Sequence, residues 1–392
     1  MEWQFWIDRG GTFTDLVGIS PLGEQIVRKF LSEQPDKHGD PAIRAIKDIL
    51  NIKEESPIPL GLIKEVRLGT TVATNALLED SGAPVVLFCN RGLKDLLKVG
   101  DQHRPELFTL KIVRPKFIAN NVLEVSGRID SKGVEMNPLV IDNELKDQVH
   151  QHLLNGEKTC AIALLNSYAN PKHELHLKEW LIRTGFEKVI CSHQVSSLPR
   201  LVPRGQTTLV EATVSSVLIA YLQQISNALG TSTRLRIMAS SGSLLVPDFL
   251  LAKDTILSGP AGGMVGAVAT AHDSGLSQKP LVGFDMGGTS TDVFYVHADQ
   301  GNNWERDSET EIAGQRLIAQ RLPIHSVAAG GGSIIYESGG RLRVGPRSAG
   351  ACPGPACYRR GGPLTITDAN LLLGRIQAET FPAIFGPSGN QI

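Results

Sequence analysis

Short apolar runs alternate with amphipathic segments along the first 200 residues of the chain. The runs expected to form strands are Phe5–Ile7, Pro84–Asn90, Thr159–Leu165 and Lys188–Ser192. Apolar residues recur with a helical period in Gly92–Lys98 and His173–Thr184, and another helix is expected to begin at Pro41 after the N-cap Asp40. Strands that alternate with helices predict an α/β sheet covered on both faces.

The second half of the chain continues this alternation. Its expected strands are Leu235–Ala239, Leu281–Asp285 and Asp292–Val296. A glycine-rich turn is expected to enter a helix over Gly259–Ala271, and Thr367 and Asp368 to cap a helix over Ala369–Arg375. Pro199, Pro203 and Gly205 interrupt the pattern between residues 196 and 205. We therefore predict two domains, 1–200 and 201–392.

One octapeptide occurs twice in the chain. Asp8–Asp15 reads DRGGTFTD and Asp285–Asp292 reads DMGGTSTD, so that six of the eight positions are identical. Each copy follows one apolar run and precedes another, which predicts a strand, a Gly-Gly-Thr turn and a second strand in both places. Asp/Gly-rich hairpins are common by themselves, but a duplication in the same context favours a shared chemical task.

The residue types of this repeat are those of a phosphate and metal site. Glycines let backbone N–H groups approach an anion at φ values that a side chain would forbid, and threonine hydroxyls add donors. A carboxylate at the end of each strand can hold Mg²⁺ and take part in catalysis, which we assign to Asp8 and Asp285. The residues expected to bind phosphate are Gly10, Gly11, Thr12, Thr14, Gly287, Gly288, Thr289 and Thr291.

The duplicated hairpin resembles the one found in acetate and sugar kinases, heat-shock chaperones and actin. That resemblance implies two ribonuclease-H-like domains with ATP in the cleft between them. It also implies a glycine-rich turn that supports adenosine after the second hairpin, for which Gly330, Gly331 and Gly332 are the candidates. An ordinary flexible loop is the alternative interpretation of these three glycines.

Longer motifs resemble those of the hydantoinase A and 5-oxoprolinase family. They are Gly69–Glu79 (GTTVATNALLE), Leu257–Gly262 (LSGPAG) and Gly345–Gly350 (GPRSAG). Ile7–Gly11 (IDRGG), Arg104–Phe108 (RPELF) and Ala351–Tyr358 (ACPGPACY) are similar to the ATP-dependent 5-oxoprolinase branch of the family.

This resemblance implies a reaction. It is the ATP-dependent opening of the 5-oxo-L-proline lactam to L-glutamate through a phosphorylated amide, in which positioning and charge neutralisation do most of the catalysis. Three alternatives stay open: a hydantoinase or carboxylase A-type subunit, a small-molecule kinase of the same fold, and a nucleotide switch without chemistry. Glutamate formation strictly coupled to ADP formation distinguishes the opening of 5-oxo-L-proline from these three alternatives.

Other polar residues have two interpretations each. Asp15 and Asp292 would orient hydroxyl groups around the turns or close the hairpins. Arg104 would pair with the substrate carboxylate or with a surface acid, and Arg347 would reach a phosphate or the substrate. Because family members extend further, we expect a C-terminally incomplete second domain, a hydantoinase B-like region or subunit as partner, and homo-oligomers.

Charge and composition restrict the binding partners and the cellular location that we expect for this protein. The net charge is −1, without a basic block, which argues against nucleic acid as a partner. Five scattered cysteines and an N-terminus without a leader pattern favour a cytoplasmic protein. The uncharged stretch Ala212–Thr233 has apolar residues on one helical face, which predicts a core helix and not a membrane span. No histidine motif supports nucleophilic hydrolysis by serine or cysteine.

Overall fold

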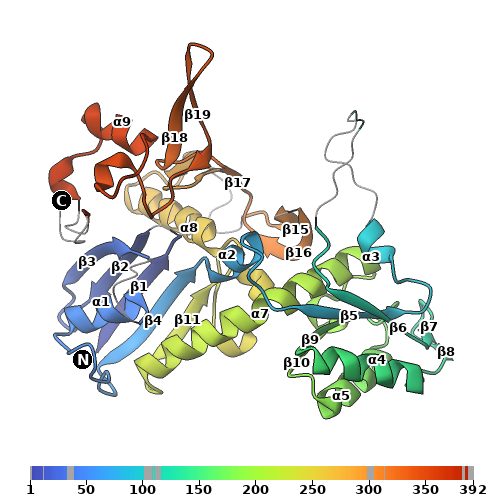
Figure 1. The fold of residues 1–392 in the computed structure, drawn as a ribbon. Coiled ribbons are helices and arrows are strands. Elements are labelled where there is room, and N and C mark those ends of the chain that lie inside the picture. Colours follow the sequence, from blue (N-terminus) through green and yellow to red (C-terminus); the bar gives the residue numbers. More distant parts are fainter. Residues whose placement is uncertain are drawn as a thin grey trace.

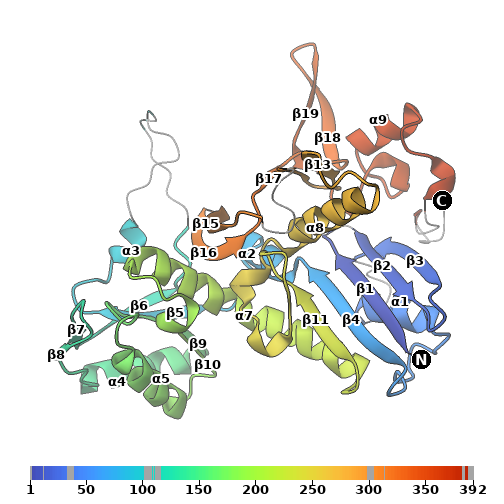
Figure 2. The ribbon, with the colours of Figure 1, turned by 180° about the vertical axis from the view of Figure 1, so that it is seen from behind.

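The computed structural model describes residues 2–11, 13–32, 39–100, 108, 110, 116–297, 304–312, 314–381 and 385–386. It shows a mixed α/β protein with three main sheets (Figures 1 and 2). Two sheets lie on either side of the long helix α7 (Leu201–Leu229), and the third follows later in the chain.

The first sheet has six strands in the order β12-β11-β4-β1-β2-β3. The strands β1, β2 and β3 form an antiparallel meander, whereas β4 and β11 run parallel to β1. The bounds are β1 (Trp3–Arg9), β2 (Phe13–Ile19), β3 (Gln25–Leu31), β4 (Ile63–Thr70), β11 (Arg234–Met238) and β12 (Leu244–Leu245). The helices α1 (Pro41–Ile49), α2 (Val72–Leu78) and α7 contribute to its core. The strands β11 and β12 of this sheet therefore come from beyond residue 200. The division of the chain into two domains near that residue stays a prediction.

The second sheet is four-stranded and entirely parallel, in the order β10-β9-β5-β6. Its strands are β5 (Val85–Asn90), β6 (Asn121–Val125), β9 (Thr159–Ala163) and β10 (Lys188–Cys191). Around it lie α3 (Leu96–Val99), α4 (Asn143–Leu154), α5 (Lys172–Thr184), α6 (Ser192–Val195) and the small hairpin β7 (Arg128–Ile129) and β8 (Glu135–Asn137). Separate apolar clusters on the two faces show that this sheet is covered on both sides, as predicted.

The third sheet repeats the beginning of the first. Its three antiparallel strands are β13 (Leu281–Met286), β14 (Thr291–Val296) and β17 (Ile324–Val327). Helix α8 (Ser258–Asp273) packs between this sheet and the first one. The remaining elements are the hairpins β15 (Asp307–Ile312)/β16 (Gln315–Arg321) and β18 (Ser333–Ser338)/β19 (Arg341–Ser348), helix α9 (Ile366–Leu372), and the short 3-10 turns 247–249, 252–255, 356–358 and 378–380.

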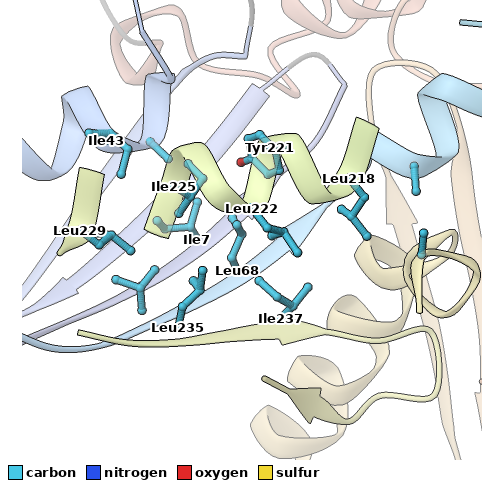
Figure 3. Packing of buried hydrophobic residues seen from close by; sticks show 14 of the residues in the cluster. Ile7, Ile43, Leu68, Leu218, Tyr221, Leu222, Ile225, Leu229, Leu235 and Ile237 are labelled. Carbon is cyan, nitrogen blue, oxygen red and sulfur yellow. The ribbon is translucent and has the colours of Figure 1, made fainter. Parts of the chain in front are cut away.

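Helix α7 is the central element of the core. Leu218, Leu222 and Ile225 pack against the first sheet (Figure 3), while Leu209 and Ala212 belong to the cluster under the second sheet. Among the described residues it is the one helix long and apolar enough to cross a membrane, and its buried side chains make it a core helix, as the sequence predicted.

Pro203 and Gly205, two of the three residues expected to interrupt the chain near position 200, lie inside α7, whereas Pro199 lies just before it. Pro203 is in the first helical turn, where its missing N–H costs nothing. Gly205 is a site of close packing, because a Cβ atom there would lie 2.7 Å from Leu97 Cδ1. The helix consequently runs without a break through Pro203 and Gly205, and the irregular stretch is limited to residues 196–200.

Several predicted elements differ in detail from the structure. The glycine-rich turn expected at residue 259 is helical, since α8 begins at Ser258. The cap of α9 is Thr365 and not Thr367; Asp368 occupies the third helical position and completes a capping box. Helix α3 is shorter than Gly92–Lys98. The helix at Pro41 is confirmed, with Asp40 accepting from the backbone N–H groups of Ala42 and Ile43.

Gly205→Leu should lower the free energy of unfolding by about 1–3 kcal/mol through overpacking against Leu97. The matched control is Gly266→Leu in α8, where no heavy atom lies within 4 Å of an added Cβ. That change should raise stability by about 0.5–1 kcal/mol, since it only removes a flexible helical glycine. Thermal unfolding of the two variants and the parent checks this; equal melting temperatures for both variants would contradict it.

Candidate functional site

The two copies of the octapeptide form hairpins with the same register. Asp8 lies opposite Asp15 in the β1–β2 pair, and Asp285 lies opposite Asp292 in the β13–β14 pair. The turns also match, because the Gly10 N–H donates to the Phe13 carbonyl at 3.0 Å and the Gly287 N–H donates to the Ser290 carbonyl at 2.9 Å. The predicted strand–turn–strand duplication is confirmed.

The second aspartate of each hairpin is held by the third strand of its sheet. Both carboxylate oxygens of Asp15 lie 2.8 Å from Lys29 Nζ on β3. Asp292 accepts a short hydrogen bond from the Ser326 hydroxyl on β17. These contacts favour a structural role for Asp15 and Asp292 in tying the hairpins to their neighbours.

The first aspartates are close enough for the charge of Asp285 to act on the carboxyl group of Asp8. Asp8 as a residue is exposed, but protein atoms crowd its carboxyl group: a Cβ at Gly69 on the adjacent β4 would lie 3.1 Å from Oδ1. This desolvation, followed by the negative charges of Asp15 and Asp285, raises the pKa of Asp8 to about 6. Asp285 is exposed, and a Cβ at Gly263 on α8 would lie 3.3 Å from its Oδ2.

A hydrogen bond between α8 and the first sheet holds the carboxylates of Asp8 and Asp285 near each other. The Ser258 hydroxyl at the start of α8 donates to the Thr70 carbonyl at 2.9 Å. Thr70 follows Gly69, which flanks Asp8, and Gly263 lies further along α8 beside Asp285. Two oxygen ligands of like charge, one with a raised pKa, form a donor set that suits a hard divalent cation such as Mg²⁺.

The threonines of the repeat are divided between the interior and the surface. Thr14 is buried and its hydroxyl lies 3.0 Å from Ser32 Oγ, which itself donates to the Gly10 carbonyl at 2.6 Å. Thr291 is buried likewise and donates to the Ala329 carbonyl at 2.5 Å. These two hydroxyls therefore support the turns from behind. Thr289 is exposed, and Thr12 lies outside the described residues.

The glycines of the turns have a different backbone conformation from the one expected. Neither Gly10, Gly11 nor Gly287 has a φ in the left-handed region, so that part of the sequence-based argument is wrong. What restricts Gly10 is space, because a Cβ there would lie 2.9 Å from the Phe13 carbonyl oxygen. At Gly11 an added Cβ would meet no heavy atom within 4 Å, which leaves the tip of the hairpin open.

The third glycine cluster packs directly on the second hairpin. The Gly331 N–H donates to the Gly287 carbonyl at 2.9 Å, and the Gly332 N–H donates to the Gly288 carbonyl at 2.6 Å. A Cβ at Gly330 would lie 2.8 Å from the Gly287 carbonyl oxygen, so only glycine permits this approach. The turn is thus held against the second hairpin, with its N–H groups bonded to protein.

The structure describes one of the two arginines singled out from the sequence. Arg347 is exposed on β19, and Arg104 lies outside the described residues. The neighbouring motif Ala351–Tyr358 folds onto α9, because the Asp368 carboxylate accepts from the Cys357 N–H at 2.6 Å. Tyr358 from this motif contacts Phe13 of the first hairpin edge to face, with ring centroids 6.3 Å apart.

Sequence reasoning missed one polar cluster. Glu174, Cys191 and His193 form a group with metal-binding residue types in the part of the chain that the structure describes. The Glu174 carboxylate is already satisfied by the Leu164 N–H at 2.9 Å, the Ser192 hydroxyl at 2.6 Å and both the N–H and ring nitrogen of His193. It therefore stabilises the ends of β9 and β10 and has no acceptor site left for an ion.

Comparison with known proteins agrees with the motifs. The profile of the hydantoinase/oxoprolinase N-terminal region matches residues 4–185, and that of hydantoinase/oxoprolinase matches residues 204–392. The chain is 37% identical to the 5-oxoprolinase of Dictyostelium discoideum and 40% identical to 5-oxoprolinase 1 of Arabidopsis thaliana, in each case over 99% of its own length. It spans 34% and 32%, respectively, of those relatives.

Solved structures share the fold. The ATP-dependent caprolactamase of Pseudomonas jessenii is 30% identical with a TM-score of 0.71, and a nucleotide-free acetone carboxylase is 23% identical with a TM-score of 0.78. Both likenesses cover 99% of this chain, and 57% and 56% of those chains. With both domain profiles matched in order and relatives aligned over nearly its whole length, the chain belongs to the hydantoinase/oxoprolinase family.

Proposed function

We propose that this chain is the nucleotide-binding part of an ATP-dependent cyclic amidase that opens the 5-oxo-L-proline lactam to L-glutamate. The observation that carries the proposal is the pair of equivalent hairpins whose first aspartates, Asp8 and Asp285, interact across two sheets. The identity with 5-oxoprolinases supports the substrate class.

Each hairpin belongs, in our proposal, to a ribonuclease-H-like unit. In the first sheet the order β3-β2-β1-β4-β11, with an antiparallel meander followed by parallel strands, supports this assignment. In the third sheet β13, β14 and β17 reproduce the meander. ATP would then lie between the two hairpins.

The chemistry follows from the weakness of an amide as an electrophile. Transfer of the γ-phosphoryl group of ATP to the lactam oxygen, with ADP as the leaving group, makes the carbonyl carbon reactive. Water then adds to that carbon, the ring C–N bond breaks to leave an acyl phosphate, and hydrolysis of the acyl phosphate releases phosphate and L-glutamate. Mg²⁺ would neutralise phosphate charge, and Asp8 and Asp285 are the residues that would hold it. The open tip at Gly11 and the exposed Thr289 would face the phosphates, and Gly330–Gly332 would fix the second turn in place.

A partner polypeptide is the second part of the proposal. Val282 and Phe284 on β13 correspond by register to Phe5 and Ile7 on β1. Phe5 and Ile7 are 0% and 6% exposed because α1 and α7 cover their face of the first sheet. Val282 and Phe284 are 67% and 70% exposed, since among the described residues no helix covers the corresponding face of β13. A hydantoinase B-like region or subunit would cover this strip, and association of two copies is the competing occupant. The cytoplasmic location stays a prediction.

Carboxylation is the competing activity. The acetone carboxylase likeness has the higher TM-score, but at 23% identity it supports the fold alone. The caprolactamase likeness at 30% identity favours a lactam. An assay of the chain with a purified B-like partner decides: glutamate release in step with ADP supports the proposal, and bicarbonate-dependent ADP formation without glutamate contradicts it.

Asp285→Asn should weaken Mg·ATP binding at least about 10-fold, a loss that even an outer-sphere partner of a metal can cause. The control is Asp273→Asn at the end of α8, where the side chain is exposed. Isothermal titration of both variants with Mg·ATP measures the effect. Parent-like affinity in a folded Asp285→Asn protein would remove this residue from the site.

Asp8→Asn should raise the melting temperature at pH 7.5 in the absence of Mg²⁺, with little gain at pH 4. The folded-state pKa of Asp8 is raised from 3.8 to about 6, so ionising this group opposes folding. That cost grows as pH rises from about 4 to about 6 and is complete above it. Melting curves at both pH values test the sign, and a stabilisation equal at both pH values would show another cause.

Ile7→Ser should lower the free energy of unfolding by about 3 kcal/mol, as expected for emptying a core position. At the equivalent position Phe284→Ser should change it by no more than about 0.5 kcal/mol, because that side chain is exposed. It should also reduce concentration-dependent association of the chain or binding of a B-like partner, measured by light scattering. Equal destabilisation by the two changes would mean that the β13 strip is buried in solution.

A further inference from the structure

A polar cavity of about 350 Å³ lies where the end of β1 meets the start of α1 and the middle of α7. The residues of its lining that matter here are Arg9, Ser32, Asp40, Arg44, Tyr221 and Gln224. Its volume suits a small molecule. Of these residues, the sequence predicts a role only for Asp40, as the N-cap of a helix.

Two buried polar atoms of this lining make no well-formed hydrogen bond among the described residues, although the Asp40 carboxylate lies beside both. They are Arg9 Nε and the Tyr221 hydroxyl, and Tyr221 is only 8% exposed. The nearest acid to Arg9 is Asp40, whose Oδ2 lies 3.7 Å from Nε, while its Oδ1 accepts from the Ala42 N–H at 2.8 Å. Because a buried donor without a well-formed hydrogen bond is costly, two such atoms in one cavity favour the binding of a further acceptor next to Asp40.

In the described lining, the Arg9 guanidinium is the group that suits an anion. The Arg9 guanidinium lies 4.8 Å from the centre of the Tyr221 ring, which holds it in place. Burial raises the pKa of Tyr221, so its hydroxyl remains a donor.

Arg9 is also where the two copies of the repeat differ. The corresponding residue in the second copy is Met286, and the only other difference is Phe13 against Ser290. Since the rest of the octapeptide is the same in both, a phosphate cradle does not require arginine at this position. The first hairpin has therefore acquired a cation that the second lacks.

We propose that this cavity binds the carboxylate of the lactam substrate, with the Arg9 guanidinium as its fork-shaped donor and the Tyr221 hydroxyl as a second donor. The inference rests on the proposed function and names a specificity-determining residue for it. A planar guanidinium matches a carboxylate in shape as well as charge. Arg104, the sequence-based candidate for this contact, lies outside the described residues.

The cavity is next to the turn that would hold phosphate. Ser32 in its wall donates to the Gly10 carbonyl at 2.6 Å, and Arg9 directly precedes Gly10. Strand alternation places Arg9 and Asp8 on opposite faces of β1. Because Gly10 and Gly11 have no side chains, a ring anchored by its carboxylate at Arg9 can extend past the end of the strand toward the phosphate side.

The test compares two ligands that differ only in the carboxylate. Binding of 5-oxo-L-proline and of 2-pyrrolidinone to the 392-residue chain is measured by titration calorimetry, with Mg²⁺ and a non-hydrolysable ATP analogue at saturation. Arg9→Met, which installs the residue of the second repeat, should weaken 5-oxo-L-proline binding about 10- to 100-fold. Binding of 2-pyrrolidinone and of the nucleotide should stay at the parent level, and weak binding of 2-pyrrolidinone to the parent is itself expected.

Tyr221→Phe distinguishes binding from folding. It removes a buried hydroxyl without a well-formed hydrogen bond, so the melting temperature should stay equal or rise while 5-oxo-L-proline affinity falls by about 3- to 10-fold. Arg28→Met is the matched control, because Arg28 lies exposed on β3 of the same sheet, away from the cavity. It should change neither affinity.

Three results would overturn the inference. Parent-like 5-oxo-L-proline affinity in folded Arg9→Met excludes the cavity and leaves the proposed function intact. Inorganic phosphate that binds the parent, displaces no 5-oxo-L-proline and is lost in Arg9→Met assigns the cavity to phosphate. A parent chain that binds the nucleotide but no 5-oxo-L-proline contradicts both this inference and the proposed substrate.

Discussion

Burial of α7 between two sheets is the constraint on which the other features of the structure depend. Its first turns pack under the second sheet and its later turns under the first, so that one helix fixes the position of both. Arg204 near its start is fully buried and donates to the Leu164 and Leu198 carbonyls and to the Ser192 hydroxyl. A buried guanidinium is tolerated only with such complete bonding, which makes the junction with the second sheet specific. Tyr221 on the same helix reaches the end of β1, so the cavity beside the first hairpin also depends on where α7 lies.

The two hairpins show that the same local sequence forms the same turn in different surroundings. Register, turn hydrogen bond and the position of the second aspartate are the same in both. The neighbours differ: β1 lies inside a six-stranded sheet, whereas β13 is an edge strand stabilised by α8 and by the turn at Gly330–Gly332. The octapeptide thus determines the geometry of the turn, and the surrounding elements determine exposure and charge.

The sequence was sufficient for features set by local physics. Apolar runs located β5, β9 and β10, and the repeat located both hairpins, because alternation and turn glycines act within a few residues. It was insufficient where distant packing decides. The glycine-rich start of α8 is helical because the helix packs between two sheets, and Thr14 faces inward because Ser32 bonds to it. The cavity unites residues from β1, α1 and α7, a combination that no spacing rule reveals.

The raised pKa of Asp8 links the architecture to the proposed chemistry. Part of that shift comes from Asp285, which belongs to another sheet and lies 277 residues further along the chain. Two like charges held near one another oppose the packing that brings them together, unless a cation lies between them. On the proposed function, Mg²⁺ with its nucleotide would supply that charge and thereby stabilise the approach of the two hairpins. The ligand needed for phosphoryl transfer would then also favour the approach of the two hairpins, so ligand binding and this approach would be coupled through the same two carboxylates.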